Sequence, residues 1–215
     1  MTMLHIQTFI VNMIEENCYL IWDDSKEAVI IDCGAFFPED RKAITDFVRE
    51  KGLQLKTFLL THGHFDHIFG AGFVQDTFGL LPQLSAKDEL LYLDAKSQLM
   101  QFMHRELPIA VPPVGGLLRD GDRITFGNLE LEVIACPGHT PGGLCFYNAE
   151  EKVLLSGDSL FQHSIGRTDF PGGNSETLVK SIRERLLTLP DDVTVFPGHG
   201  PSTTIGEEKH FNPYL

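Results

Sequence analysis

The stretch Thr61-His62-Gly63-His64-Phe65-Asp66-His67 decides how the chain is interpreted, because it places three histidines and an aspartate within six residues. It directly follows the apolar residues 55–60, which predict a strand. Imidazole and carboxylate groups suit zinc, iron or manganese, and a strand holds the loop at its end in a fixed position. The stretch therefore predicts a metal centre with hydrolytic chemistry at the edge of a sheet.

Three further loops place histidine or aspartate directly after an apolar strand pattern. They are Pro137-Gly138-His139-Thr140, Gly157-Asp158-Ser159 and Pro197-Gly198-His199-Gly200. A single histidine is usually an ordinary core or surface residue, so none of these positions alone indicates a site. Five of the nine histidines lie in such loops, however, and together they predict one metal-binding cluster.

The rest of the chain predicts an α/β fold built from two similar halves. The first half has strand patterns at 18–22, 28–31 and 55–60, a helix over 38–51, and a helix from Ser85 to about Met103. The second half has strand patterns at 129–135, 144–147, 153–155 and 193–196, and a helix over 175–187. Asp88 is placed as the partner of Ser85 in a capping box. Strands followed by a helix, twice over, indicate layered α/β packing.

A loop rich in proline and glycine, residues 107–120, separates the two halves. A loop of this length is uncommon as a simple connector in a compact domain. It is therefore interpreted as a lid over the site, with a boundary between two domains as the alternative.

Composition excludes several classes of protein. The 215 residues carry 17 Lys and Arg against 30 Asp and Glu, a formal net charge of −13, which opposes binding to nucleic acid or to an anionic membrane. No apolar run approaches the length of about 18 residues that a transmembrane helix needs. The N-terminal sequence has no pattern typical of a signal peptide. The four cysteines form no CxxC pair and are interpreted as buried, reduced thiols rather than two disulfides, which predicts a cytoplasmic protein.

The histidine-rich stretch, with His139, Asp158 and His199, resembles the T-H-x-H-x-D-H pattern of the metallo-β-lactamase superfamily. The resemblance runs from Ile31-Asp32-Cys33-Gly34 to Gly198-His199-Gly200-Pro201 and implies a four-layer αββα sandwich. It implies that His62, His64 and His139 hold one divalent metal ion, that Asp66, His67 and His199 hold another, and that Asp158 bridges the two. Zinc is the expected metal, with iron or manganese as alternatives. Asp32 either supports the metal ligands or only bonds the backbone.

Two further stretches are similar to the short bacterial glyoxalase II-like hydrolases of that superfamily. They are residues 166–173, Gly-Arg-Thr-Asp-Phe-Pro-Gly-Gly, and the ending from Gly198 to Glu208 with Asn212-Pro213. These relatives resemble hydroxyacylglutathione hydrolases without the C-terminal helical domain that supplies basic residues for glutathione. Residues 1–215 are accordingly expected to form a single domain. Arg167 matches a basic residue of the family, but Asp169 stands where an aromatic residue is expected, which weakens the case for glutathione as the thiol.

The resemblance implies hydrolysis of a thioester such as an S-(2-hydroxyacyl) thiol. Two metal ions about 3.5–4 Å apart generate a bridging hydroxide at neutral pH, which needs no serine or cysteine nucleophile. Asp158 would bridge the metals and Asp66 would orient the hydroxide, which makes both catalytic. Arg167 either binds a substrate carboxylate or forms a salt bridge with Asp169. His163 either borders the pocket or lies on the surface.

The alternative function is that of a persulfide dioxygenase of the same fold, with a single iron held by His62, His139 and Asp158. His67 and His199, which complete a second metal site, favour the hydrolase. A β-lactamase would need export, a nuclease would need a basic surface, and a non-catalytic binding module would have lost some of the ligands. The sequence leaves open the acyl group, the carrier thiol and the oligomeric state.

Overall fold

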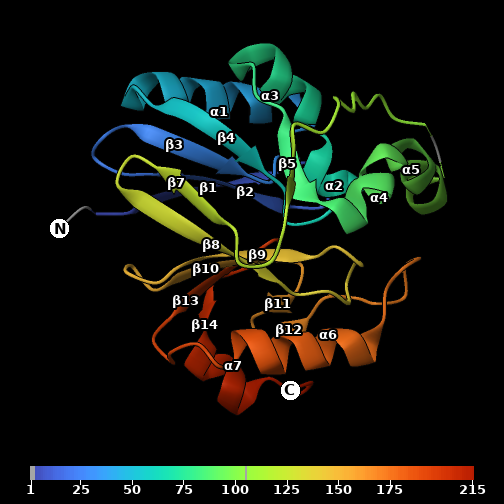
Figure 1. The fold of residues 1–215 in the computed structure, drawn as a ribbon. Coiled ribbons are helices and arrows are strands. Elements are labelled where there is room, and N and C mark those ends of the chain that lie inside the picture. Colours follow the sequence, from blue (N-terminus) through green and yellow to red (C-terminus); the bar gives the residue numbers. More distant parts are fainter. Residues whose placement is uncertain (1–2, 105) are drawn as a thin grey trace.

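Two six-stranded sheets stack face to face, and helices cover both outer faces (Figure 1). This is the predicted four-layer αββα sandwich. The computed structural model describes residues 3–104 and 106–215. The first two residues, on which the interpretation of the N-terminal sequence partly rests, lie outside the described residues, as does residue 105.

The first sheet is formed by one continuous part of the chain. In spatial order its strands are β1 (His5–Val11), β2 (Glu16–Trp22), β3 (Glu27–Ile31), β4 (Gln54–Leu59), β5 (Pro82–Ser85) and β6 (Gly116–Leu118). The hairpin of β2 and β3 confirms the two strand patterns in this region, and β3 to β6 run parallel. Parallel strands need a crossover, and α1 (Pro38–Lys51) makes the one from β3 to β4. This helix begins at Pro38 and ends before Gly52, whose φ of 64° is the left-handed conformation typical of a helix end.

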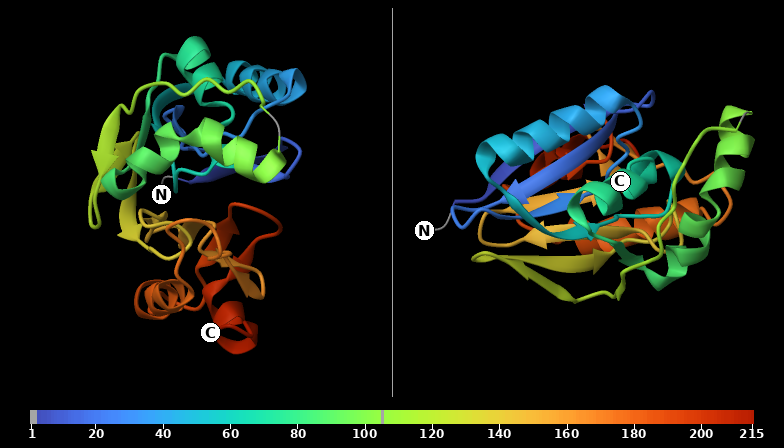
Figure 2. Two further views of the ribbon diagram at one scale, coloured as in Figure 1. Left: turned by 90° about the vertical axis from the view of Figure 1, so that its right-hand side faces the viewer. Right: turned by 90° about the horizontal axis from the view of Figure 1, so that it is seen from above.

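The second sheet repeats this plan from the next part of the chain. Its spatial order is β14 (Thr203–Thr204), β13 (Thr194–Pro197), β10 (Val153–Gly157), β9 (Leu144–Asn148), β8 (Leu129–Ala135) and β7 (Arg123–Phe126). Its outer face is covered by α6 (Ser175–Ser181), by the π-helical turn η2 (Ile182–Leu186) that continues it, and by α7 (Ile205–Phe211) (Figure 2). A small hairpin of β11 (Leu160–Phe161) and β12 (Ser164–Ile165) follows β10.

Strand alternation divides the apolar residues among three layers of core. Leu20 and Ile30 pack toward α1, whereas their neighbours Ile21 and Ile31 pack into the space between the sheets. Successive side chains of a strand point to opposite faces, so strands covered on both faces read as continuous apolar runs. A third core lies between the second sheet and its helices. The sandwich therefore buries both faces of both sheets. A binding site can then form only at the sheet edges or at the ends of the strands.

The prediction of one continuous helix from Ser85 to Met103 is wrong. The segment is broken into the 3-10 turn η1 (Ala86–Asp88) and the helices α4 (Glu89–Leu93) and α5 (Ala95–Met103). The Ser85 side chain caps the turn by accepting the Lys87 N–H, but the predicted capping box is absent from it, because Asp88 is fully buried and bonds residues of other loops. Those tertiary bonds take the Asp88 side chain away from the helix start.

The predicted loop over residues 107–120 contains β6, which pairs with β5. The part before β6 lies against the first half, because Ile109 and Val111 pack on its core and the Tyr92 hydroxyl donates to Pro112 O at 2.6 Å. After β6 the chain passes to β7 in the other sheet. The segment thus connects the two sheets, and both the lid and the boundary between two domains remain predictions.

All four cysteines lie within the described residues and are buried with free thiols. This agrees with the interpretation of reduced cysteines, and the cellular compartment stays a prediction. Among residues 3–104 and 106–215, every helix is too short or too polar to cross a membrane.

Candidate metal centre

The ends of four strands bring all seven predicted residues together at one end of the sandwich, between the two halves. His62 and His64 follow β4, and Asp66 and His67 lie on the short helix α2 (Phe65–Ile68). The second half supplies His139, Asp158 and His199 after β8, β10 and β13. His64 Nδ1 lies 2.9 Å from His139 Nε2, and His199 Nε2 lies 3.3 Å from Asp66 Oδ2. Each of these pairs joins the two halves.

The cluster divides into the two groups that the resemblance implies. One possible ligand atom from each of His62, His64 and His139 lies within 4.8 Å of the others, and the same holds for Asp66, His67 and His199. Asp158 lies between the groups, because its Oδ2 is 3.6 Å from His139 Nε2 and 3.8 Å from His199 Nε2. The arrangement matches two neighbouring metal positions with a shared carboxylate.

Three buried polar atoms of the cluster have no hydrogen-bond partner: His62 Nε2, His67 Nε2 and Asp158 Oδ1. A buried polar atom without a partner costs free energy, so native structures rarely keep one. Divalent cations bound in the two groups would satisfy all three. The donors are nitrogen and oxygen atoms without sulfur, a set that suits zinc, iron or manganese. The residues therefore fit the predicted metal ions.

Asp32 settles one of the open alternatives, because its carboxylate serves two histidines. Oδ2 lies 2.9 Å from His67 Nδ1 and accepts the Thr61 hydroxyl at 2.7 Å. The Thr61 oxygen in turn lies 2.9 Å from His62 Nδ1. Hydrogen bonds at Nδ1 leave Nε2 of both rings free to face the cluster. Asp32 thus supports histidines of both groups, and it also accepts the backbone N–H of Thr61 at 2.8 Å.

Electrostatics differ between the two groups. Burial holds the pKa of His62 well below its usual value and lowers the pKa of His64 to about 3, so both rings stay neutral. Burial also opposes a charge on His67, but the carboxylates of Asp158, Asp32 and Asp66 outweigh it and raise the pKa of this ring well above its usual value. Likewise, burial opposes ionisation of Asp158, yet the nearby His67 holds its pKa well below its usual value. The first group offers neutral nitrogen donors. In the second group, nearby carboxylates balance a positive charge on His67.

The second-half ligands are held mainly by the backbone. His139 Nδ1 lies 2.7 Å from the carbonyl oxygen of Arg167. The turn that carries His199 is fixed by the buried Asn17, whose side chain donates to Pro197 O at 3.0 Å and whose backbone N–H donates to Gly198 O at 2.8 Å. A Cβ atom at Gly198 would collide with Asp158 and His67, which explains the glycine of this turn.

Asp88 joins the loops of the two halves and was not expected at the site. Its Oδ2 accepts the Gly63 N–H at 3.1 Å and the Thr140 hydroxyl at 2.7 Å, and its Oδ1 accepts the Gly142 N–H at 2.6 Å. Gly63 lies between two histidines of the first group, and Thr140 follows the third. A fully buried carboxylate therefore connects the two parts of the three-histidine group.

A cavity of about 190 Å³ opens over the cluster, and Ile14, Phe102, Arg167 and Phe170 line it beside the cluster residues. Arg167 forms the salt bridge that was one of its two interpretations: Nε lies 2.8 Å from Asp169 Oδ1, and Nη2 lies 2.7 Å from Oδ2. Its binding of a substrate carboxylate stays a prediction. His163 lies on the surface and contacts Glu207 at 2.9 Å, away from the lining of the cavity.

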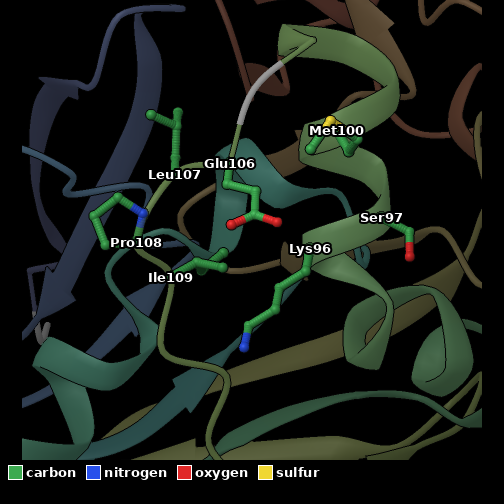
Figure 3. Close-up of a pocket in the computed structure, with 7 residues that line it drawn as sticks. All are labelled: Lys96, Ser97, Met100, Glu106, Leu107, Pro108 and Ile109. Carbon is green, nitrogen blue, oxygen red and sulfur yellow. The ribbon is translucent and has the colours of Figure 1, made fainter.

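A separate cavity of about 700 Å³ lies on the other side of α5 (Figure 3). Lys96, Ser97 and Met100 line it from the helix, and residues 106–109 line it from the segment that follows. It contains none of the cluster residues, so the candidate site is the cavity over the metal ligands.

The profile of the metallo-beta-lactamase superfamily matches residues 14–199, which include all seven cluster residues. The chain belongs to this superfamily. Among curated relatives in the superfamily, hydroxyacylglutathione hydrolase GloC of Haemophilus influenzae is 39% identical over 99% of this chain and 98% of that protein. These comparisons support metal-dependent hydrolysis as the general activity of the chain.

Two solved structures of the metallo-beta-lactamase fold are similar over nearly the whole chain. BLEG-1 B3 metallo-beta-lactamase is 38% identical with a TM-score of 0.90, over 98% of this chain and 99% of that one. TTHA1623 in a di-iron-bound form is 36% identical with a TM-score of 0.86, over 97% of this chain and 100% of that one. The superfamily fold and the histidine and aspartate cluster together imply divalent metal ions.

Proposed function

We propose that the chain hydrolyses thioesters, in particular S-(2-hydroxyacyl) thiols, at a centre of two divalent metal ions. The observation that carries the proposal is the position of Asp158 between two groups of three ligands, with one buried oxygen that has no partner. The similarity to a relative named hydroxyacylglutathione hydrolase supports the substrate class. A small-molecule thioester is thus the proposed partner, rather than nucleic acid or a membrane.

The proposed ligands of the first ion are His62, His64 and His139, and those of the second are Asp66, His67 and His199, with Asp158 shared. When bound, divalent ions lower the pKa of water and polarise a carbonyl oxygen. Zinc is the proposed metal, and iron or manganese would suit the same donors.

The chain's own groups account for the remaining needs of the reaction. The water oxygen bonds to the acyl carbon, the carbon–sulfur bond breaks, and the products are a carboxylate, a thiol and one proton. A thiol has a pKa near 8.5, so the thiolate leaves without a strong acid. Asp66 and Asp158 present carboxylates to the cavity that would accept hydrogen bonds from the attacking water. The described residues that line this cavity include no serine or cysteine, in keeping with direct attack by water.

Elemental analysis and a turnover assay on one sample test the proposal. Protein purified without added metal is expected to contain about two divalent ions per chain and to release thiol from S-lactoylglutathione or S-lactoyl-N-acetylcysteamine. The variant His64→Ala is expected to lose metal and turnover, whereas His163→Ala, a surface histidine, keeps both. Fully loaded protein that releases no thiol from any thioester would contradict the proposal.

The same sample tests two other functions. A persulfide dioxygenase would contain one iron per chain, held by His62, His139 and Asp158, and would consume oxygen with a persulfide. The similarity to BLEG-1 B3 metallo-beta-lactamase favours a β-lactam assay as well. Hydrolysis of a β-lactam without thioester turnover would replace the thioester by an amide as the proposed substrate.

A further inference from the structure

A second cavity, of about 220 Å³, adjoins the one over the metal cluster. The two share His64, Phe65, Phe102 and Phe170 as lining residues and therefore lie side by side. The cavity over the cluster has room for a reacting carbonyl and a short hydroxyacyl group. The rest of a thioester, its carrier thiol, then extends into the adjoining cavity.

The walls of the adjoining cavity are aromatic. The ring centroids of Phe65 and Phe102 lie 5.3 Å apart, and those of Phe102 and Phe170 lie 5.7 Å apart in an edge-to-face arrangement. The polar lining residue Gln98 is hydrogen-bonded within the protein. Its side chain accepts the Phe65 N–H at 3.1 Å and donates to Gly63 O and Leu91 O. Asp94 and Gln101, which are exposed, add polar groups at the rim, while Phe65, Phe102 and Phe170 with Leu91 and Pro171 supply an apolar wall that favours an apolar ligand.

The charges around the two cavities oppose an anionic carrier. Among the described lining residues, Arg167 is the only arginine or lysine, and its guanidinium already makes two hydrogen bonds to Asp169. The same guanidinium lies 3.8 Å from the ring centroid of Phe170, which fixes it further. Asp94 adds a negative charge to the adjoining cavity. A carboxylate in the adjoining cavity would find no lysine, and the one arginine among the described lining residues of the two cavities is already paired with Asp169.

We propose that the adjoining cavity binds the carrier thiol of the substrate and selects thiols that are apolar and free of carboxylates. The inference rests on the proposed thioester hydrolysis and names its carrier class. Asp169 acts as a specificity-determining residue, because it is hydrogen-bonded to the Arg167 guanidinium, which would otherwise be free to bind a carboxylate of the substrate. Phe102 and Phe170 supply the contact area for the thiol.

Thioesters with one acyl group and different carriers test the selection. The probes are S-lactoyl thioesters of glutathione, of glutathione diethyl ester and of benzyl mercaptan, each assayed with the metal-loaded protein. The first two differ in that the two carboxylates of glutathione are replaced by uncharged ethyl esters. We expect kcat/KM to be about tenfold higher for the diethyl ester than for glutathione and highest for benzyl mercaptan, whose ring is buried against the phenylalanines.

Two pairs of variants assign the selection to these residues. Asp169→Asn frees Arg167 and is expected to raise kcat/KM for the glutathione thioester, relative to its diethyl ester, by about threefold. Its control Asp192→Asn removes an equally exposed partner of a lysine, Lys152, elsewhere in the chain, and is expected to leave that ratio unchanged.

Phe102→Ala is expected to lower kcat/KM for the benzyl thioester by about tenfold and to leave that for the glutathione thioester nearly unchanged. Leu90→Ala, which truncates an apolar side chain that is 80% exposed and outside the cavity, is the control.

The outcomes separate the inference from the function on which it rests. Thioester turnover that is as fast with glutathione as with its diethyl ester and benzyl mercaptan overturns the carrier selection and leaves the hydrolase in place. An Asp169→Asn variant with the same ratio as Asp192→Asn overturns the role of Asp169. If the loaded protein cleaves none of the three thioesters, the proposed function itself fails.

Discussion

The two halves of the sandwich hold their parts of the cluster by different means. In the first half, four of the seven residues lie within one loop and one helical turn, and a buried carboxylate, Asp32, supports two of them. In the second half, His139, Asp158 and His199 come from three separate strand ends. There a backbone carbonyl, that of Arg167, supports His139, and the Arg167 side chain forms an exposed ion pair.

The difference indicates where the cluster is most sensitive to substitution. A buried carboxylate can be removed by a single substitution, and the histidines that it orients then lose their partner in a region of low dielectric. A carbonyl oxygen is present whatever the side chain, so support by the backbone tolerates substitution. Exposed ion pairs contribute little to stability. We therefore expect the effects of substitution to decrease from the first half to the second.

The largest effect is expected for Asp32. Asp32→Asn removes a hydrogen-bond acceptor of His67 and of Thr61, and we expect the affinity for divalent metal to fall by about 10- to 100-fold in both groups. Asn is a suitable replacement, because the φ of 49° at this position is one that asparagine tolerates. Competition with a chromophoric chelator measures the affinity.

Thr61→Val provides the matched comparison for Asp32. It removes only the hydroxyl that connects Asp32 to His62 and leaves the contact between Asp32 and His67. We expect weaker binding of one metal equivalent with the other unchanged. Equal loss of both equivalents in Thr61→Val would show that the two groups are not supported separately.

An intermediate effect is expected for Asp88, which joins the two halves at the cluster. Asp88→Asn weakens bonds to Gly63, Thr140 and Gly142, and we expect a cost of about 1–3 kcal/mol in the free energy of unfolding together with a lower metal content. Urea unfolding and elemental analysis measure the two quantities.

Asp23 is the control for Asp88, because its side chain is also shielded from solvent and connects the two halves, through hydrogen bonds from the backbone and side chain of Asn128. Asp23→Asn is expected to lower the free energy of unfolding by a similar amount and to leave the metal content at two equivalents. Normal metal content in Asp88→Asn would reduce its role to stability alone.

The smallest effect is expected for pH at the exposed ion pair of the second half. The hydrogen bond from Arg167 lowers the pKa of Asp169 to about 2. A depressed pKa means that the pair is complete above the ordinary aspartate range near 3.9 and is lost only as the pH falls through about 2. We expect the ratio of kcat/KM for the two glutathione thioesters to be constant between about pH 5 and 6, below the range in which the α-amino groups of the carriers titrate. A change of more than about threefold would indicate another titrating group near the carrier.

The sequence predicted the members of the cluster because each lies in a segment that follows a strand, and four of them lie together in the stretch after β4. Apart from Asp32, for which support of the ligands was one of two alternatives, it did not predict the residues that hold the cluster together. Asn17 bonds Pro197, which is 180 positions away, and Asp88 bonds Gly142, which is 54 positions away. Such partners are brought together only by the stacking of the sheets, so no local pattern indicates them.

The errors in the predicted fold have the same origin. The apolar spacing after Ser85 is helical, and helices do form there, but the bonds of Asp88 to the neighbouring loops interrupt them. β6 was missed within the Gly/Pro-rich segment, because its pairing with β5 is parallel and long-range. In these two segments, contacts with distant parts of the chain decided where the elements begin and end, whereas the ends of α1 are set locally by Pro38 and Gly52.

The contiguity of the two sheets has a consequence for how a newly synthesised chain matures. β1 to β6 lie within residues 5–118, and β7 to β14 lie within residues 123–204. On the ribosome, the first sheet can pair fully before the second has emerged, but its inner apolar face stays uncovered until then. His199 is the last cluster residue to be translated, so the site can be completed only after both sheets exist. Metal uptake is then a late event that marks a finished molecule.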